Sequence, residues 1–264
     1  MILDEFFSLV TEMSVSKKSL AGFVIPKKQE DITALQDWAD TSGEFTLRNE
    51  TLNINEPVGF ELSPRLQNGL GYASYESYFD KKREWWESPS FDNVVEHQWL
   101  LHQASDKHIS PEKLQIVAQL LKLLTDKNRF YVTGNIVVFF SKKPSELALK
   151  AQNSHTFVQL IHDLAEPQVQ AIKKICVLLG GNTEDEHFHS KKNAFSIALT
   201  DYLTEKEGRI QHDICDLLAD IVNITNQALA QYELYLEDFS YSKFVKKIEE
   251  SSTKFISRVN DTLS

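Results

Sequence analysis

The feature that most constrains the fold is a regular repeat of apolar residues near the end of the chain. Within residues 209–237, apolar or small side chains recur at spacings that alternate between four and three, from Ile214 to Tyr235. Such spacing lines one side of a helix and is typical of a helix that packs lengthwise against others. The sequence therefore predicts a long helix over 209–237 and, after it, a second long helix over 241–263.

The remainder of the second half also has a helical pattern. Apolar residues at helical spacing predict three further helices, and Pro167 and the Gly180–Gly181 pair mark a helix start and a helix end. These helices cover residues 154–165, 167–179 and 183–206. We therefore expect residues 146–264 to form an all-helical subdomain, an antiparallel bundle with long heptad-like helices.

The first half predicts a mixture of strands and helices. Alternating apolar residues around the polar pair Asn49–Glu50 predict a hairpin, and a further short strand is expected soon after it. These strands cover residues 45–47, 52–54 and 58–62. Segment 129–141 is dense in β-branched and aromatic residues, and Thr133–Gly134–Asn135 either turns it into a second hairpin or forms a bulge within one strand.

Helices are also expected in the first half, over residues 2–13, 30–39 and 110–126. The predicted fold class is therefore α+β. Residues 1–145 are expected to form a mixed subdomain with β-hairpins, which packs on the helical bundle of residues 146–264.

The composition favours a globular chain and argues against several classes. Of 264 residues, 28 are Lys or Arg and 38 are Asp or Glu, which gives a formal net charge of −10. This balance argues against a nucleic-acid partner, because binding phosphates requires a basic face. The apolar runs are far shorter than the roughly 18–20 residues of a membrane-spanning helix. Two cysteines in apolar helical contexts, Cys176 and Cys215, suit a reducing compartment, so we expect a cytoplasmic protein.

The first candidate site is a cluster of acids and histidines at the start of the predicted 183–206 helix. Glu184 and His187 are three residues apart, as are Glu186 and His189. On a helix this spacing lets a carboxylate and an imidazole share a metal ion, so these four are the candidate catalytic residues. The alternative is a solvated helix start, where carboxylates interact favourably with the helix dipole. The pattern alone assigns no metal ligand and no cofactor.

The second candidate site is an aromatic segment at residues 72–99 that also contains a group of basic residues. It has three interpretations: the core of the mixed subdomain, a surface for a protein partner, or a site that stacks a nucleotide. The residues proposed for ligand or partner binding are Tyr75, Tyr78, Lys82, Arg83, Trp85 and Trp86.

The last 33 residues, YELYLEDFSYSKFVKKIEESSTKFISRVNDTLS, carry a pattern of Tyr, Leu, Phe and Lys at helical spacing. This segment, residues 232–264, resembles part of a group of uncharacterised bacterial proteins, some of them near defence loci. In that group a cytoplasmic region leads through a long helix into paired membrane spans. The resemblance covers about an eighth of the chain and includes no catalytic motif, so it implies no site residue. It implies membrane association only through a segment that would follow residue 264.

The sequence contains no Walker loop, GxGxxG, HExxH, GxSxG or CxxC motif. We therefore expect a non-enzymatic interaction or sensor module, which the resemblance places among bacterial defence or stress-response proteins. It would bind a protein partner or self-associate, and it would oligomerise or signal through its C-terminal helices. The alternative is a metal-dependent nuclease or hydrolase that uses the cluster at residues 184–189.

Overall fold

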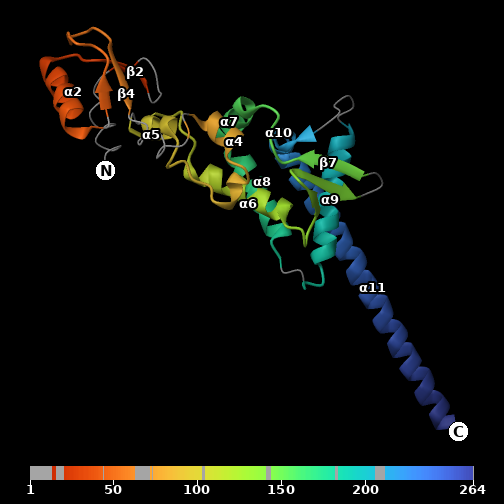
Figure 1. Cartoon of the computed structure of the whole chain (residues 1–264). Coiled ribbons are helices and arrows are strands. Elements are labelled where there is room, and N and C mark those ends of the chain that lie inside the picture. Colours follow the sequence, from red (N-terminus) through yellow and green to blue (C-terminus); the bar gives the residue numbers. More distant parts are fainter. Residues whose placement is uncertain are drawn as a thin grey trace. The chain divides into compact units, whose positions relative to one another are not determined.

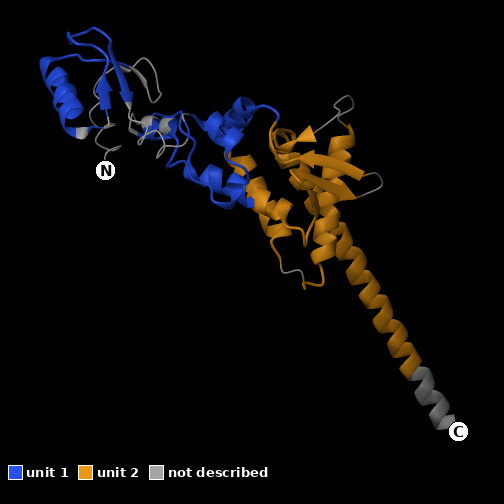
Figure 2. Ribbon diagram, viewed as in Figure 1, with its two compact units in different colours: residues 1–119, 152–164 blue, residues 120–151, 165–264 orange. Residues whose placement is uncertain are grey.

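The structure is a computed structural model that describes residues 14–15, 21–43, 45–62, 72, 74–102, 105–140, 144–181, 184–205 and 212–263. The helix predicted over residues 2–13 lies outside this part of the chain. The chain forms two compact units, residues 1–119 with 152–164 (unit 1) and residues 120–151 with 165–264 (unit 2), which Figure 2 colours separately. Helices and strands occur in both, so the fold is α+β, as the sequence predicts.

The two units do not follow a single boundary near residue 145. Residues 152–164 belong with unit 1, because the helix α7 (Ser154–Asp163) packs against α4 (Tyr75–Lys81). Residues 120–151 belong with unit 2, because their strands pack against the helix α9 (Phe188–Glu205). Contacts between segments far apart in sequence therefore decide the division, and sequence order does not show them.

Unit 1 contains a four-stranded antiparallel sheet in the order β1-β2-β4-β3. The strands are β1 (Ser14–Val15), β2 (Ala21–Ile25), β3 (Phe45–Leu47) and β4 (Val58–Leu62). The helix α2 (Gln29–Ser42) lies against β3, with the Trp38 ring edge-on to Phe45 at a centroid distance of 4.8 Å (Figure 1). Phe45 in turn stacks on Phe60 at 5.6 Å, and this aromatic contact closes the small core.

The predicted return strand at 52–54 is wrong, because β3 pairs with β4. The register sets Leu47 opposite Phe60, and both Val58 and Phe60 are buried. Ile54 is instead an exposed apolar side chain in the connection. Pairing with residues 58–62 places two buried apolar side chains, Val58 and Phe60, on the partner strand.

Further helices complete unit 1. After α4 come a 3₁₀ turn at Trp85–Glu87, α5 (Val95–His102) and the first part of α6 (Pro111–Thr125). Ser74 caps α4 by accepting a hydrogen bond from the Ser77 N–H, and Asn153 caps α7 in the same way through the Thr156 N–H. The caps fix where the two helices begin, and α4 packs against α7.

Unit 2 contains the second sheet, in the order β5-β6-β7-β8. Its strands are β5 (Tyr131–Thr133), β6 (Ile136–Phe140), β7 (Pro144–Ala148) and β8 (His212–Asp213). The segment 129–141 is a hairpin rather than a bulged strand, since Thr133 pairs with Ile136 and Gly134 adopts a φ of +57° at the turn. Glycine takes this backbone conformation without steric cost.

The expectation of an all-helical second half is wrong at two strands. β7 pairs antiparallel with β6, and β8 pairs parallel with β7, so that Leu147 lies opposite His212. Leu147 is fully buried, while the surrounding Ser145 and Glu146 give the segment no local apolar alternation. Pairing with distant strands therefore decides these elements.

The helices of unit 2 are α8 (Glu166–Leu179), α9, α10 (Ile214–Ala219) and α11 (Ile221–Leu263). α9 covers one face of the sheet, where the Phe195 ring contacts Phe139 at 6.1 Å. α11 packs on α8 and α9 and then runs on beyond them (Figure 1). No described helix combines the length and the apolar composition that crossing a membrane requires.

The boundaries predicted for the two helices over 209–237 and 241–263 are also wrong. Asp213 begins the short helix α10 by accepting a hydrogen bond from the Cys215 N–H, and this helix ends at Asp220. α11 then continues through residues 238–240, which contain neither glycine nor proline. The predicted apolar seam is buried in its first turns, where Ile221, Thr225 and Ala228 face the body of unit 2.

Candidate functional site

The aromatic segment on α4 and the following turn forms part of the core of unit 1. Tyr75, Tyr78, Trp85 and Trp86 are all between 1% and 6% exposed. The Phe79 ring contacts Phe157 of α7 at 4.9 Å. This placement corrects the interpretation of the four rings as a partner or nucleotide surface, because their faces pack against other side chains. The side chain of Trp99 lies outside the described residues.

The two basic candidates of this segment differ in their surroundings. Lys82 is half-buried, and its ammonium donates a hydrogen bond to the Ser88 carbonyl at 2.9 Å and lies 5.1 Å from the centre of the Tyr78 ring. Arg83 is exposed. Lys82 therefore closes the aromatic core from its polar side, and Arg83 is the one candidate of this group that faces solvent fully.

A buried polar pair lies inside this aromatic core. The Tyr75 hydroxyl accepts a hydrogen bond from the Ile109 N–H at 3.3 Å and lies 2.7 Å from Nδ1 of His97. Burial, with a smaller contribution from the nearby His108, lowers the pKa of His97 to about 4, and burial raises the pKa of Tyr75 above its usual value. Both groups are therefore neutral near neutral pH, and they share a hydrogen bond inside the core.

The cluster at residues 184–189 is not arranged as the helical spacing predicts. α9 begins at Phe188, so Glu184, Glu186 and His187 lie in the turn before it, and the three-residue spacing brings no pair onto one helical face. Within the described ranges, no group of three or more acidic, histidine or cysteine side chains is placed to hold a metal ion. The prediction that each carboxylate and its histidine lie on one helical face, where they could share a metal ion, is therefore wrong.

Two of the four candidates instead contact α11. The His187 ring lies edge-on to Phe239 with a centroid distance of 5.0 Å and to Tyr235 at 5.8 Å. An Oε1 atom of Glu186 lies 3.6 Å from the Lys243 ammonium. Glu184 and His189 are exposed, and His189 contacts the neighbouring Phe188 ring. We call residues 184–187 the exit turn, because they contact α11 near the point where it leaves α9.

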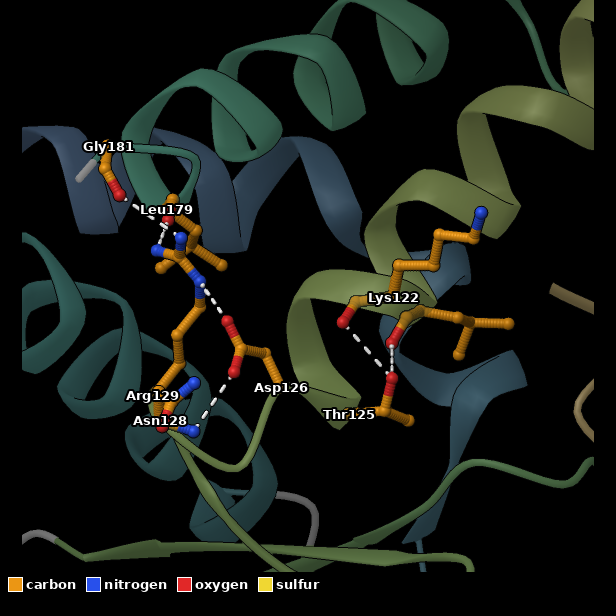
Figure 3. A network of polar contacts seen from close by, with 8 residues as sticks. Lys122, Thr125, Asp126, Asn128, Arg129, Leu179 and Gly181 are labelled. Carbon is orange, nitrogen blue, oxygen red and sulfur yellow. Dashed lines mark hydrogen bonds and ion pairs between the residues drawn. The ribbon is translucent and has the colours of Figure 1, made fainter. Parts of the chain in front are cut away.

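The exit turn is supported by an arginine that the sequence patterns do not single out. The Arg129 guanidinium pairs with Asp126 at 2.8 Å and donates hydrogen bonds to the carbonyls of Leu179 and Gly181, as Figure 3 shows. It also lies over the Phe188 ring at 5.1 Å. The nearly buried Arg129 side chain thus donates hydrogen bonds to carbonyls at the C-terminal end of α8 and packs on Phe188, the first residue of α9.

The distal half of α11 presents a different surface. Residues 240–254 are exposed apart from a partly covered Val245, although several are large and apolar. At about 100° per residue, these apolar side chains lie roughly opposite Phe239, on the face turned away from the packed seam. We call this set the distal stripe; it comprises Leu234 (60% exposed), Tyr241 (68%), Phe244 (62%) and Ile248 (49%).

The distal stripe could have been found from the sequence only in part. The helical spacing of Phe244 and Ile248 is visible in the printed sequence, but the packed seam has a similar spacing. The structure separates the two sets, because it shows which face of α11 contacts α8 and α9.

Comparisons with known proteins identify no relative. No protein-family model matches the sequence, and neither the curated proteins nor the solved structures include a match.

Proposed function

We propose that this chain is an interaction module that self-associates through the distal stripe of α11. The observation that carries the proposal is a row of exposed apolar side chains on α11, on the face opposite the seam that packs the first part of this helix on unit 2. Surfaces of this kind are costly in water unless another apolar surface covers them. The stripe therefore supports a role in binding.

A second copy of the same chain is the partner that fits this stripe. Leu234, Tyr241 and Ile248 are seven residues apart, with Phe244 between them, which is the spacing by which two helices interlock along their length. A second α11 presents the same stripe with the same spacing, so two copies can pack stripe against stripe along their length.

The energies are compatible with reversible association. Burying one large apolar side chain contributes roughly 1.5–3 kcal/mol, and each copy offers four such side chains on the stripe. Association costs about 4–15 kcal/mol in lost freedom of motion. We therefore expect a dimer that forms and dissociates with concentration.

Sedimentation velocity over a wide range of concentrations tests the proposal. The native chain is expected to shift from monomer to dimer, and Phe244→Glu is expected to stay monomeric because it places a charge within the stripe. Thr253→Glu is the matched control, since Thr253 is exposed on the opposite side of the helix. A native chain that remains monomeric at every concentration contradicts the proposal, as does equal dimerisation of both variants.

A further inference from the structure

We propose that the exit turn is a positioning site for α11, with His187 as its central residue, and that it sets how strongly the distal stripe associates. This inference rests on the proposed self-association for its effect on binding. The positioning itself is a property of the folded chain and is measured separately.

The contacts that hold α11 change along its length. Its first turns are buried on one face, at Ile224 and Ala228 among others. Further along, Tyr232, Tyr235 and Phe239 are only half-buried, and their rings form a stacked ladder with centroid distances of 6.2 and 5.8 Å. From residue 240 to residue 254 the helix is exposed apart from Val245. Up to residue 254, the ladder is therefore the last group of rings on α11 that is half-buried, and the exposed Glu186–Lys243 pair contacts the helix just beyond it.

The exit turn and the start of α9 contact each step of this ladder. His187 lies edge-on to two of its rings, at 5.0 Å from Phe239 and 5.8 Å from Tyr235. The Lys191 ammonium lies 5.9 Å from the centre of the Tyr232 ring. These contacts cover the side of the ladder that faces the turn.

His187 acts here through its ring rather than through a hydrogen bond. Its Nδ1 atom is buried and has no hydrogen-bond partner among the described residues. The Glu186–Lys243 pair contributes less, because both side chains are more than 60% exposed and their attraction is screened by water. Lys243 also lies 4.4 Å from the centre of the Phe239 ring, which keeps it beside the ladder.

The exit turn can position another element because it is itself firmly placed. The Asp185 carboxylate accepts a hydrogen bond from the His187 N–H at 3.0 Å and pairs with the Lys191 ammonium at 2.6 Å. Arg129 holds the following Phe188. The His187 ring is thereby presented to α11 from a fixed backbone, as a site on a rigid support requires.

The consequence for binding follows from entropy. Where the last supported turns of a helix fray, the association of its distal half must also pay for ordering them. Contacts that order those turns in the monomer remove that cost. Removing the His187 ring is therefore expected to weaken association about fivefold to tenfold without changing the stripe itself.

Hydrogen exchange and sedimentation, both on the full chain, test the inference together. His187→Ala is expected to speed amide exchange over residues 232–243 and to raise the dimer dissociation constant. His189→Ala is the matched control, because His189 comes from the same cluster but is exposed and contacts Phe188. His187→Phe keeps a ring at this position and is expected to retain slow exchange and native association, which separates positioning from general loss of folding.

The outcomes distinguish this inference from the proposed function. If His187→Ala and His189→Ala show the same exchange over residues 232–243, the positioning role is wrong, whatever the oligomeric state. If exchange responds as expected but the native chain is a monomer, self-association is wrong, and with it the effect on binding. If the native chain dimerises and His187→Ala dimerises equally well, the stripe binds independently of the exit turn.

Discussion

The rings of His187 and Phe239 meet edge to face, at a centroid distance of 5.0 Å and an interplanar angle of 86°. This contact joins a turn that the sequence marks as a possible metal site to a helix that the sequence marks as a packing element. We therefore interpret His187 as a residue that positions α11, and no longer as a candidate catalytic residue.

Arg129 is expected to be one of the most important polar residues for the stability of unit 2. Arg129→Ala removes the ion pair with Asp126 and leaves the carbonyls of Leu179 and Gly181 without their donor. We expect a loss of about 2–4 kcal/mol in the free energy of unfolding, measured by urea denaturation.

Arg48→Ala is the control for this prediction. Arg48 pairs with Glu61 at a similar distance, 2.8 Å, but both side chains are at least half exposed. Its loss is expected to cost less than about 1 kcal/mol. Equal effects of the two substitutions would show that the carbonyl contacts of Arg129 contribute little.

Because the His97 imidazole is buried, we expect the free energy of unfolding to fall in mild acid. Because burial lowers the pKa of His97 from 6.5 to about 4, the unfolded chain binds a proton on His97 between these values while the folded chain does not. The contribution is fully present above pH 6.5 and falls as the pH drops toward 4, by at most about 1.4 kcal/mol per pH unit. Denaturation at several pH values measures this slope, and His97→Phe is expected to reduce it. An unchanged slope would place its origin in other groups.

Tyr75→Phe tests the hydrogen bonds inside the same core. The substitution keeps the ring but removes the hydroxyl that contacts His97 and accepts from the Ile109 N–H. We expect a loss of about 1–3 kcal/mol, because buried polar atoms are left without partners. Tyr131→Phe, at an exposed position on β5, is expected to change the free energy of unfolding by less than about 0.5 kcal/mol. Similar values for both variants would argue against the buried pair.

The aromatic segment offers a direct comparison of core and surface. Trp85 is buried, so Trp85→Ala is expected to destabilise the chain by about 3–5 kcal/mol. Arg83 is exposed, and Arg83→Ala is expected to stay within about 0.5 kcal/mol of the native value. Thermal or urea denaturation separates the two. A native-like stability of Trp85→Ala would restore the surface interpretation of this segment.

Several elements were predictable because their signal is local. α6 follows from its apolar stripe and its initial proline. The β-branched and aromatic residues of segment 129–141 predicted β-structure, but only the structure decided between a hairpin and a bulged strand. The candidate sites were less predictable. Residue type and spacing identified His187 and Glu186, but not that they would contact α11. Arg129 had no signal, because the Leu179 and Gly181 carbonyls that it binds come from a distant segment, and only Asp126 is close to it in sequence.

Periodicity along the chain indicates which face of an element is buried. It was enough to predict the α+β class, most of the helices and the apolar seam of α11. Tertiary structure alone decided that Leu147 pairs beside His212 and that the rings around Tyr78 form a core. It also decided that Tyr241 and Ile248 remain exposed while Ala228 is buried. A side chain is buried only where a distant part of the chain packs on it. Two apolar faces of one helix therefore look alike in the sequence, and only the structure shows which of them is covered.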